Sequence, residues 1–172
     1  MQNISVPEIR KEIEHLEAKE LRDLILQLAK FKRENKELLA YKLFDASDEE
    51  YFIEQLKESI AEQFGQINRD HYYYIKKSVR KILRYAKKYI RFSNKKETEI
   101  EILTYFLHCL SKMRPDYSRN SVLRGIYQRE LLYVKKCISQ VHPDLQLDYR
   151  QELDKLWTLI NSSYDLLNTR DL

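Results

Sequence analysis

The segment from His71 to Lys96 carries the side chains whose type and spacing are best suited to binding chemistry. It contains ten lysine and arginine residues and no aspartate or glutamate. The rest of the chain holds 21 basic and 27 acidic residues, so the positive charge is concentrated in this one segment. Clustered ammonium and guanidinium groups neutralise phosphates and release counterions, which is how proteins hold a nucleic-acid backbone.

These cations occupy one side of a predicted helix. With 3.6 residues per turn, six apolar side chains between Ile75 and Ile90 fall on one face. Eight cations and one tyrosine fall on the opposite face and form the predicted contact site: Tyr73, Lys76, Lys77, Arg80, Lys81, Arg84, Lys87, Lys88 and Arg91. Like charges four residues apart destabilise an isolated helix by about 0.2–0.5 kcal/mol per pair, so another group must offset the repulsion.

One group that could offset it lies in the preceding segment. Ser47 and Glu50 have the spacing of a capping box and predict the start of a helix that extends to about Ile67. The polar side of this helix carries four acids: Glu50, Glu54, Glu58 and Glu62. A short connection makes consecutive helices antiparallel neighbours, so the acidic helix 48–62 could neutralise the basic helix inside the molecule.

An external polyanion is the other way to offset the repulsion. A second basic excess, seven basic against two acidic residues between Lys112 and Lys136, could extend the same surface. Tyr73 could stack on a base beside the phosphate contacts. An anionic membrane surface is a further alternative, although it needs the apolar face that the core also requires. An acidic protein partner completes the set of alternatives.

The residues that could support catalysis do not converge on one site. Glu12 and His15 form a single Glu-x-x-His pair, whereas di-iron bundles use that pair on two helices. His108 and Cys109 are adjacent in a predicted helix, so their side chains point about 100° apart. Only two glycines occur, which excludes a glycine-rich phosphate loop. We therefore predict no catalytic, metal or cofactor site and a protein that is not an enzyme.

The thiols and the start of the chain indicate a cytoplasmic protein. Cys109 and Cys137 lie 28 residues apart without a CxxC motif, so we expect two reduced, buried thiols. The opening residues, MQNISVPEIRKEIEHLEA, lack the apolar core of a signal peptide. No apolar run reaches the length of a membrane span.

Helical periodicity runs through almost the whole chain and predicts an all-α fold. Two glycines and three prolines are too few for a loop-rich β fold. We expect one domain over residues 1–172, with short N-terminal helices over 5–44 and longer helices over 48–168. Six or seven mostly antiparallel helices would form a bundle or a short helical array.

Polar residues predict where the helices begin and end. Ser5 opens a capping box, and Asn35 and Asp70 are expected to cap a third short helix and the basic helix. Ser93 or Asn94 is expected to end the basic helix, and a later helix should run from about Asn120 to Val141. The last helix is expected to show one apolar side: Leu153, Leu156, Trp157, Ile160, Tyr164 and Leu167.

The first third of the chain resembles a known group of proteins. The stretch IRKEIEHLEAKELRDLILQLAKFKRENKELLAYKLF, followed by DEEYFIEQLKESIAEQF, is similar to the start of small all-helical bacterial proteins classed as domains of unknown function. That resemblance implies an all-α fold and supplies no activity and no site residues. The first 30 residues also resemble the short DNA-binding helix–turn–helix modules of eukaryotic scaffold-attachment proteins. Those modules need a glycine in the turn, where this chain reads LEAKEL.

The sequence therefore supports two hypotheses about function. The first is a non-enzymatic protein that binds a polyanion, namely nucleic acid, through the basic helix at 76–91. The second is a helical protein–protein interaction module with internally balanced charge and no nucleic-acid role. The position of the acidic helix in the folded protein separates the two, because an acidic helix laid over the basic face would leave little surface for phosphates.

Overall fold

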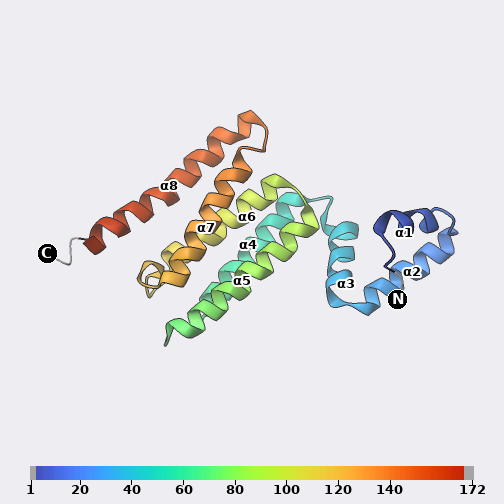
Figure 1. Ribbon diagram of the computed structural model, residues 1–172, viewed down its shortest axis with the longest axis horizontal. Coiled ribbons are helices and arrows are strands. Elements are labelled where there is room, and N and C mark those ends of the chain that lie inside the picture. The colour runs from blue at the N-terminus through green and yellow to red at the C-terminus, as the bar shows by residue number, and fades with distance from the viewer. Residues whose placement is uncertain (1–2, 169–172) are drawn as a thin grey trace. The chain divides into compact units, whose positions relative to one another are not determined.

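The computed structural model describes residues 3–168, with side chains described as far as residue 156. Every regular element in that range is helical, which confirms the predicted all-α fold (Figure 1). The described range contains eight α-helices because its N-terminal part divides into three short ones. Two compact units make up the chain, and the boundary lies between Asp45 and Ala46. No described helix is both long enough and apolar enough to cross a membrane.

The first unit contains short helices and a π-helical turn: α1 (Val6–Ile13), α2 (Ala18–Phe31), α3 (Arg33–Ala40) and η1 (Tyr41–Asp45). The backbone N–H of Ser5 donates to the Glu8 carboxylate at 2.7 Å, which confirms the capping box at the start of α1. The prediction that Asn35 caps the third helix is wrong, because that helix begins two residues earlier. The Asn35 amide instead donates to the carbonyl of Leu28 at 2.9 Å and ties α3 to α2.

The second unit contains the longer helices: α4 (Glu49–Gly65), α5 (Tyr72–Ser93), α6 (Lys96–Lys112), η2 (Tyr117–Arg119, a 3-10 turn), α7 (Ser121–Ile138) and α8 (Pro143–Asn168). Helix α6 is central, because it packs against α4, α5, α7 and α8. All five side chains predicted for the apolar side of α4 are buried: Phe52, Ile53, Leu56, Ile60 and Phe64. All six predicted for α5 are buried as well: Ile75, Val79, Ile82, Leu83, Ala86 and Ile90.

Two predicted helix starts are wrong by one residue. Helix α4 is capped by Asp48 rather than Ser47, and the Asp48 carboxylate accepts from the backbone N–H of Tyr51 at 3.0 Å. Helix α5 follows His71 rather than Asp70, and the His71 side chain makes no capping hydrogen bond.

Two other predicted ends are confirmed, and one lies three residues beyond the observed end. Asn94 ends α5 in the left-handed conformation, with φ of 59°, and the Asn120 side chain opens α7. Helix α7 ends at Ile138, somewhat before the predicted Val141. On the predicted apolar side of the last helix, Leu153 and Leu156 are buried. The other four predicted side chains lie outside the described ones: Trp157, Ile160, Tyr164 and Leu167.

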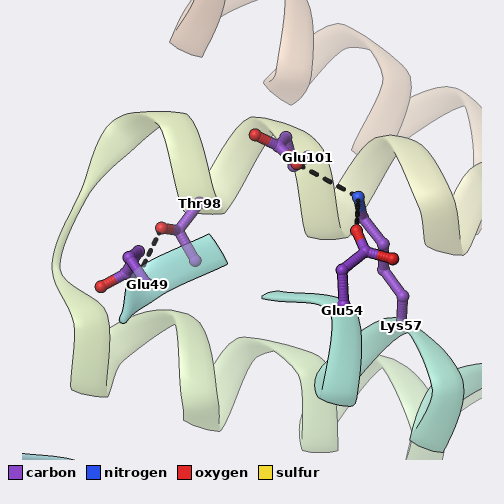
Figure 2. Close-up of polar contacts among 5 residues, drawn as sticks. All are labelled: Glu49, Glu54, Lys57, Thr98 and Glu101. Carbon is purple, nitrogen blue, oxygen red and sulfur yellow. Dashed lines mark hydrogen bonds and ion pairs between the residues drawn. The ribbon is translucent and has the colours of Figure 1, made fainter. Parts of the chain in front are cut away.

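Polar contacts tie α4 to α6 (Figure 2). The Glu49 carboxylate accepts from the Thr98 hydroxyl at 2.7 Å. Farther along α4, the Lys57 ammonium reaches across to Glu101 at 3.1 Å while also contacting Glu54 at 2.8 Å (Figure 2). Burial acts to lower the pKa of Lys57, but the two carboxylates outweigh it and raise that pKa. Acidic side chains of α4 are thus engaged with its own lysine and with α6.

Candidate nucleic-acid interface

Helix α5 presents the predicted cations on the side opposite its buried face. Six of them are exposed: Lys77, Arg80, Lys81, Arg84, Lys87 and Arg91. The other two, Lys76 and Lys88, are half-buried. The assignment of the two faces from the sequence is therefore confirmed. Among the described residues, five of the eight cations make no ion pair or hydrogen bond: Lys76, Lys77, Arg80, Lys81 and Arg84.

The acidic face of α4 does not cover these cations. Its four predicted acids are all exposed: Glu50, Glu54, Glu58 and Glu62. Within the described range, none of the four forms an ion pair with α5, and Glu54 contacts Lys57 of its own helix instead. These four acids therefore do not offset the repulsion along α5, whereas Glu49 at the start of the same helix lies 3.0 Å from the Lys95 ammonium and accepts from the Ser93 hydroxyl.

A cleft of about 720 Å³ lies between α5 and the first half of α7. Six cations and five other residues line it, and none of them is acidic: Arg80, Arg84, Lys87, Lys88, Arg91 and Arg129, and Leu83, Ser121, Val122, Gly125 and Ile126. We call this feature the α5–α7 cleft. A Cβ atom placed on Gly125 would meet no heavy atom within 4 Å, so the cleft is open at that point. The α5–α7 cleft thus joins a cationic rim to an apolar lining.

A buried carboxylate stands beside this cleft. Glu130 of α7 is 2% exposed, and its Oε2 atom lies 2.7 Å from the Lys87 ammonium. The approach is an ion pair that lacks hydrogen-bond geometry, since Oε2 has no hydrogen-bond partner in the described structure. The Arg129 guanidinium lies 3.7 Å from the other carboxylate oxygen. Glu130 therefore offsets part of the positive charge, a contribution that the sequence analysis did not anticipate.

Tyr133 and Glu99 continue the polar contacts made by Lys87 and Glu130. The Lys87 ammonium lies 5.6 Å from the centre of the Tyr133 ring, within range of a cation–π interaction. The Tyr133 hydroxyl donates to Glu99 at 2.8 Å, which raises the pKa of Tyr133, and Lys96 contacts the same carboxylate at 2.8 Å. Burial acts to raise the pKa of Glu99, but the bonds from Lys96 and Tyr133 lower it. Lys87 is thereby held between two groups of α7.

The structure brings five of the nine predicted contact residues together at the cleft: Arg80, Arg84, Lys87, Lys88 and Arg91. The other four lie outside its lining: Tyr73, Lys76, Lys77 and Lys81. Tyr73 is 65% exposed, and its ring packs edge-on against Tyr74. Sequence reasoning missed Arg129 as a lining residue. The basic excess between Lys112 and Lys136 was the available signal, but it did not show which face of α7 turns toward α5.

A second group of reactive side chains, Tyr105, His108, Cys109 and Lys112, lines a smaller pocket of about 350 Å³ between α4 and α6. Burial raises the pKa of the half-buried Cys109 thiol, which makes it a weaker nucleophile at neutral pH. Burial together with Lys112 lowers the pKa of His108. The prediction of two buried thiols is correct for Cys137 and wrong for Cys109, which is only half-buried, and neither cysteine forms a disulfide. Among the described residues, no group of three histidine, cysteine, aspartate or glutamate side chains could hold a metal ion.

Comparisons with known proteins find no family model, no curated protein and no solved structure that matches the chain. The resemblance of the first third to small all-helical bacterial proteins therefore remains a hypothesis. The function of the chain has to be inferred from the side chains of α5 and α7 and from their surroundings.

Proposed function

We propose that the protein is a non-enzymatic nucleic-acid-binding protein that contacts phosphates through the cationic side of α5. The observation that carries the proposal is the uncovered charge: the apolar side of α5 is buried, and five cations of its opposite side make no ion pair in the described structure, namely Lys76, Lys77, Arg80, Lys81 and Arg84. Arg129 adds a cation from α7 across the cleft. A cytoplasmic setting with reduced thiols is part of the same proposal.

Phosphate contacts of this kind have a characteristic signature. Each neutralised phosphate releases condensed counterions, so the logarithm of the affinity falls with the logarithm of the salt concentration. The slope is about −0.9 per contact for duplex DNA and about −0.7 for single strands. Lysine and arginine side chains that contact the backbone position the protein without reading base edges, so we expect little sequence preference.

The experiment measures this slope for three proteins. The wild type is compared with Arg80→Gln/Arg84→Gln, which removes two cleft cations that make no ion pair within the described structure. The matched control, Arg69→Gln/Lys112→Gln, removes the same charge from two residues that do not line the cleft. The cleft variant should flatten the slope by about 1.5 and the control by far less. Equal slopes for the two double variants, or no binding by the wild type at low salt, would contradict the proposal.

A second candidate function rests on the first unit. Among its described residues only Tyr41 is buried, while large apolar side chains are strongly exposed: Val6 at 74%, Phe31 at 76%, Leu43 at 70% and Phe44 at 74%. Exposed apolar groups in such numbers are typical of surfaces that bind another protein. Sedimentation of the wild type and of Leu43→Ser/Phe44→Ser tests this candidate for self-association, because a surface that joins two copies should lose affinity in the variant.

A further inference from the structure

The α5–α7 cleft has a composition that phosphate binding alone does not explain. Cations suffice to hold phosphates, yet the lining also includes three apolar side chains: Leu83, Val122 and Ile126. The volume of about 720 Å³ lies within the range of sites that enclose a small organic group. A DNA duplex presents its phosphate backbone and the edges of its base pairs to a protein. Its bases are also stacked and paired, so they cannot reach an apolar lining.

Gly125 keeps the centre of this lining open. It stands inside α7, where glycine is a poor helix former, and it is one of only two glycines in the chain. Its missing side chain is not required by close packing, because a Cβ atom there would meet nothing within 4 Å. The space above Gly125 is therefore available to a flat group that enters between the cationic rims.

We propose that the α5–α7 cleft binds single-stranded rather than duplex nucleic acid, with an unpaired base against the apolar lining and its flanking phosphates on the rims. This inference rests on the proposed function and names its substrate class. Arg80 and Arg84 lie on one rim and Arg129 on the other, so phosphates on both sides of the base meet a cation. The residues from Arg80 to Arg91 span about 16 Å of helix, which matches about five phosphates of a stacked strand.

The experiment compares single-stranded and duplex oligonucleotides of the same length at the same salt concentration, by fluorescence anisotropy. Three proteins are used: the wild type, Gly125→Leu, which fills the open space, and Gly65→Leu, which makes the same change at a glycine of α4 that does not line the cleft. We expect the wild type to prefer the single strand by about tenfold, the preference that burial of roughly 55 Å² of apolar surface supplies. Gly125→Leu should lose about that preference and keep its duplex binding, whereas Gly65→Leu should bind both within about twofold of the wild type.

A second variant protects the test against a folding failure. Ser121→Trp places a bulky group in the cleft from an exposed position whose side chain makes no hydrogen bond in the described structure. Circular dichroism and thermal unfolding confirm that each variant is folded. Equal binding of duplex and single strand, or single-strand binding that neither filling variant reduces, would overturn the inference and leave the proposed function standing. Efficient displacement of the strand by tripolyphosphate from the wild type and from Gly125→Leu alike would also overturn it. No binding of either oligonucleotide would instead refute the proposed function itself.

Discussion

Replacing Glu130 by glutamine should weaken the fold and strengthen nucleic-acid binding at the same time. Glu130 is 2% exposed and contacts Lys87 at 2.7 Å, so its charge holds the ammonium against α7. Glutamine keeps the size of the side chain and removes its charge. Lys87 is 46% exposed, so its ammonium can turn out into the cleft once the carboxylate is gone. The substitution thus releases the Lys87 ammonium from the ion pair that holds it in the intact protein.

The magnitudes follow from the two environments. Breaking a fully buried ion pair costs about 3–5 kcal/mol, but the exposed ammonium of Lys87 regains water and reduces that cost. The remaining cost is an amide in an almost fully buried site, which is about 1–3 kcal/mol when it lacks a partner. For binding, one more free cation should steepen the logarithmic salt slope by about 0.7–0.9.

Urea unfolding and binding titrations at several salt concentrations measure the two effects. A loss of about 2 kcal/mol should lower the urea midpoint by about 1 M at a typical slope for small proteins. The control is Glu58→Gln, which removes the same charge from an exposed position on α4 whose described contact is with Gln55. Glu58→Gln should leave stability almost unchanged and affect binding only through net charge. A Glu130→Gln protein with wild-type stability and wild-type salt slope would refute the assignment of this ion pair.

Three further predictions concern stability, pH and the thiols. Gly125→Ala should stabilise the protein by about 0.5–1 kcal/mol in thermal unfolding, since alanine favours a helix and meets no obstacle there. The lowered pKa of Glu99 stabilises the fold above the ordinary glutamate pKa, and this contribution is lost as the pH falls through the lowered value. Tyr133→Phe removes one of the bonds that lower it, so acid unfolding should begin at a higher pH, as circular dichroism can show. Burial raises the pKa of both Cys109 and Cys137, so alkylation of the native protein should be slow at neutral pH and accelerate on unfolding. Rapid labelling of Cys137 in the native state would contradict its buried position.

The faces of α5 could be predicted from the sequence because one helix contains the whole pattern. Its apolar and cationic residues separate at 3.6 residues per turn, and burial against α4 and α6 follows that separation. The cleft could not be predicted in the same way. It depends on which face of α7 meets α5, and that is decided by packing around α6 rather than by the pattern of α7 alone.

Glu130 shows the same limit on a single residue. In the sequence it is one acid in a basic stretch, and a glutamate in such a stretch is usually exposed. Its ion-pair partner Lys87 lies 43 residues earlier on another helix, so no local sequence pattern predicts the pair. The capping residues failed for a smaller reason, because Ser47 and Asp48 are both acceptable caps and differ by one position of the helix.

The arrangement of α5 and α7 on α6 has a mechanical consequence for the cleft. Both walls pack on α6 and contact each other much less, so few direct contacts set the spacing between them. Cations on both walls push them apart, and the attraction between Lys87 and Glu130 pulls them together. A bound anion would attract both walls, so the cleft should narrow when an anion binds, and its width should change with ionic strength. Distance measurements between spin labels on α5 and α7 would report that width directly.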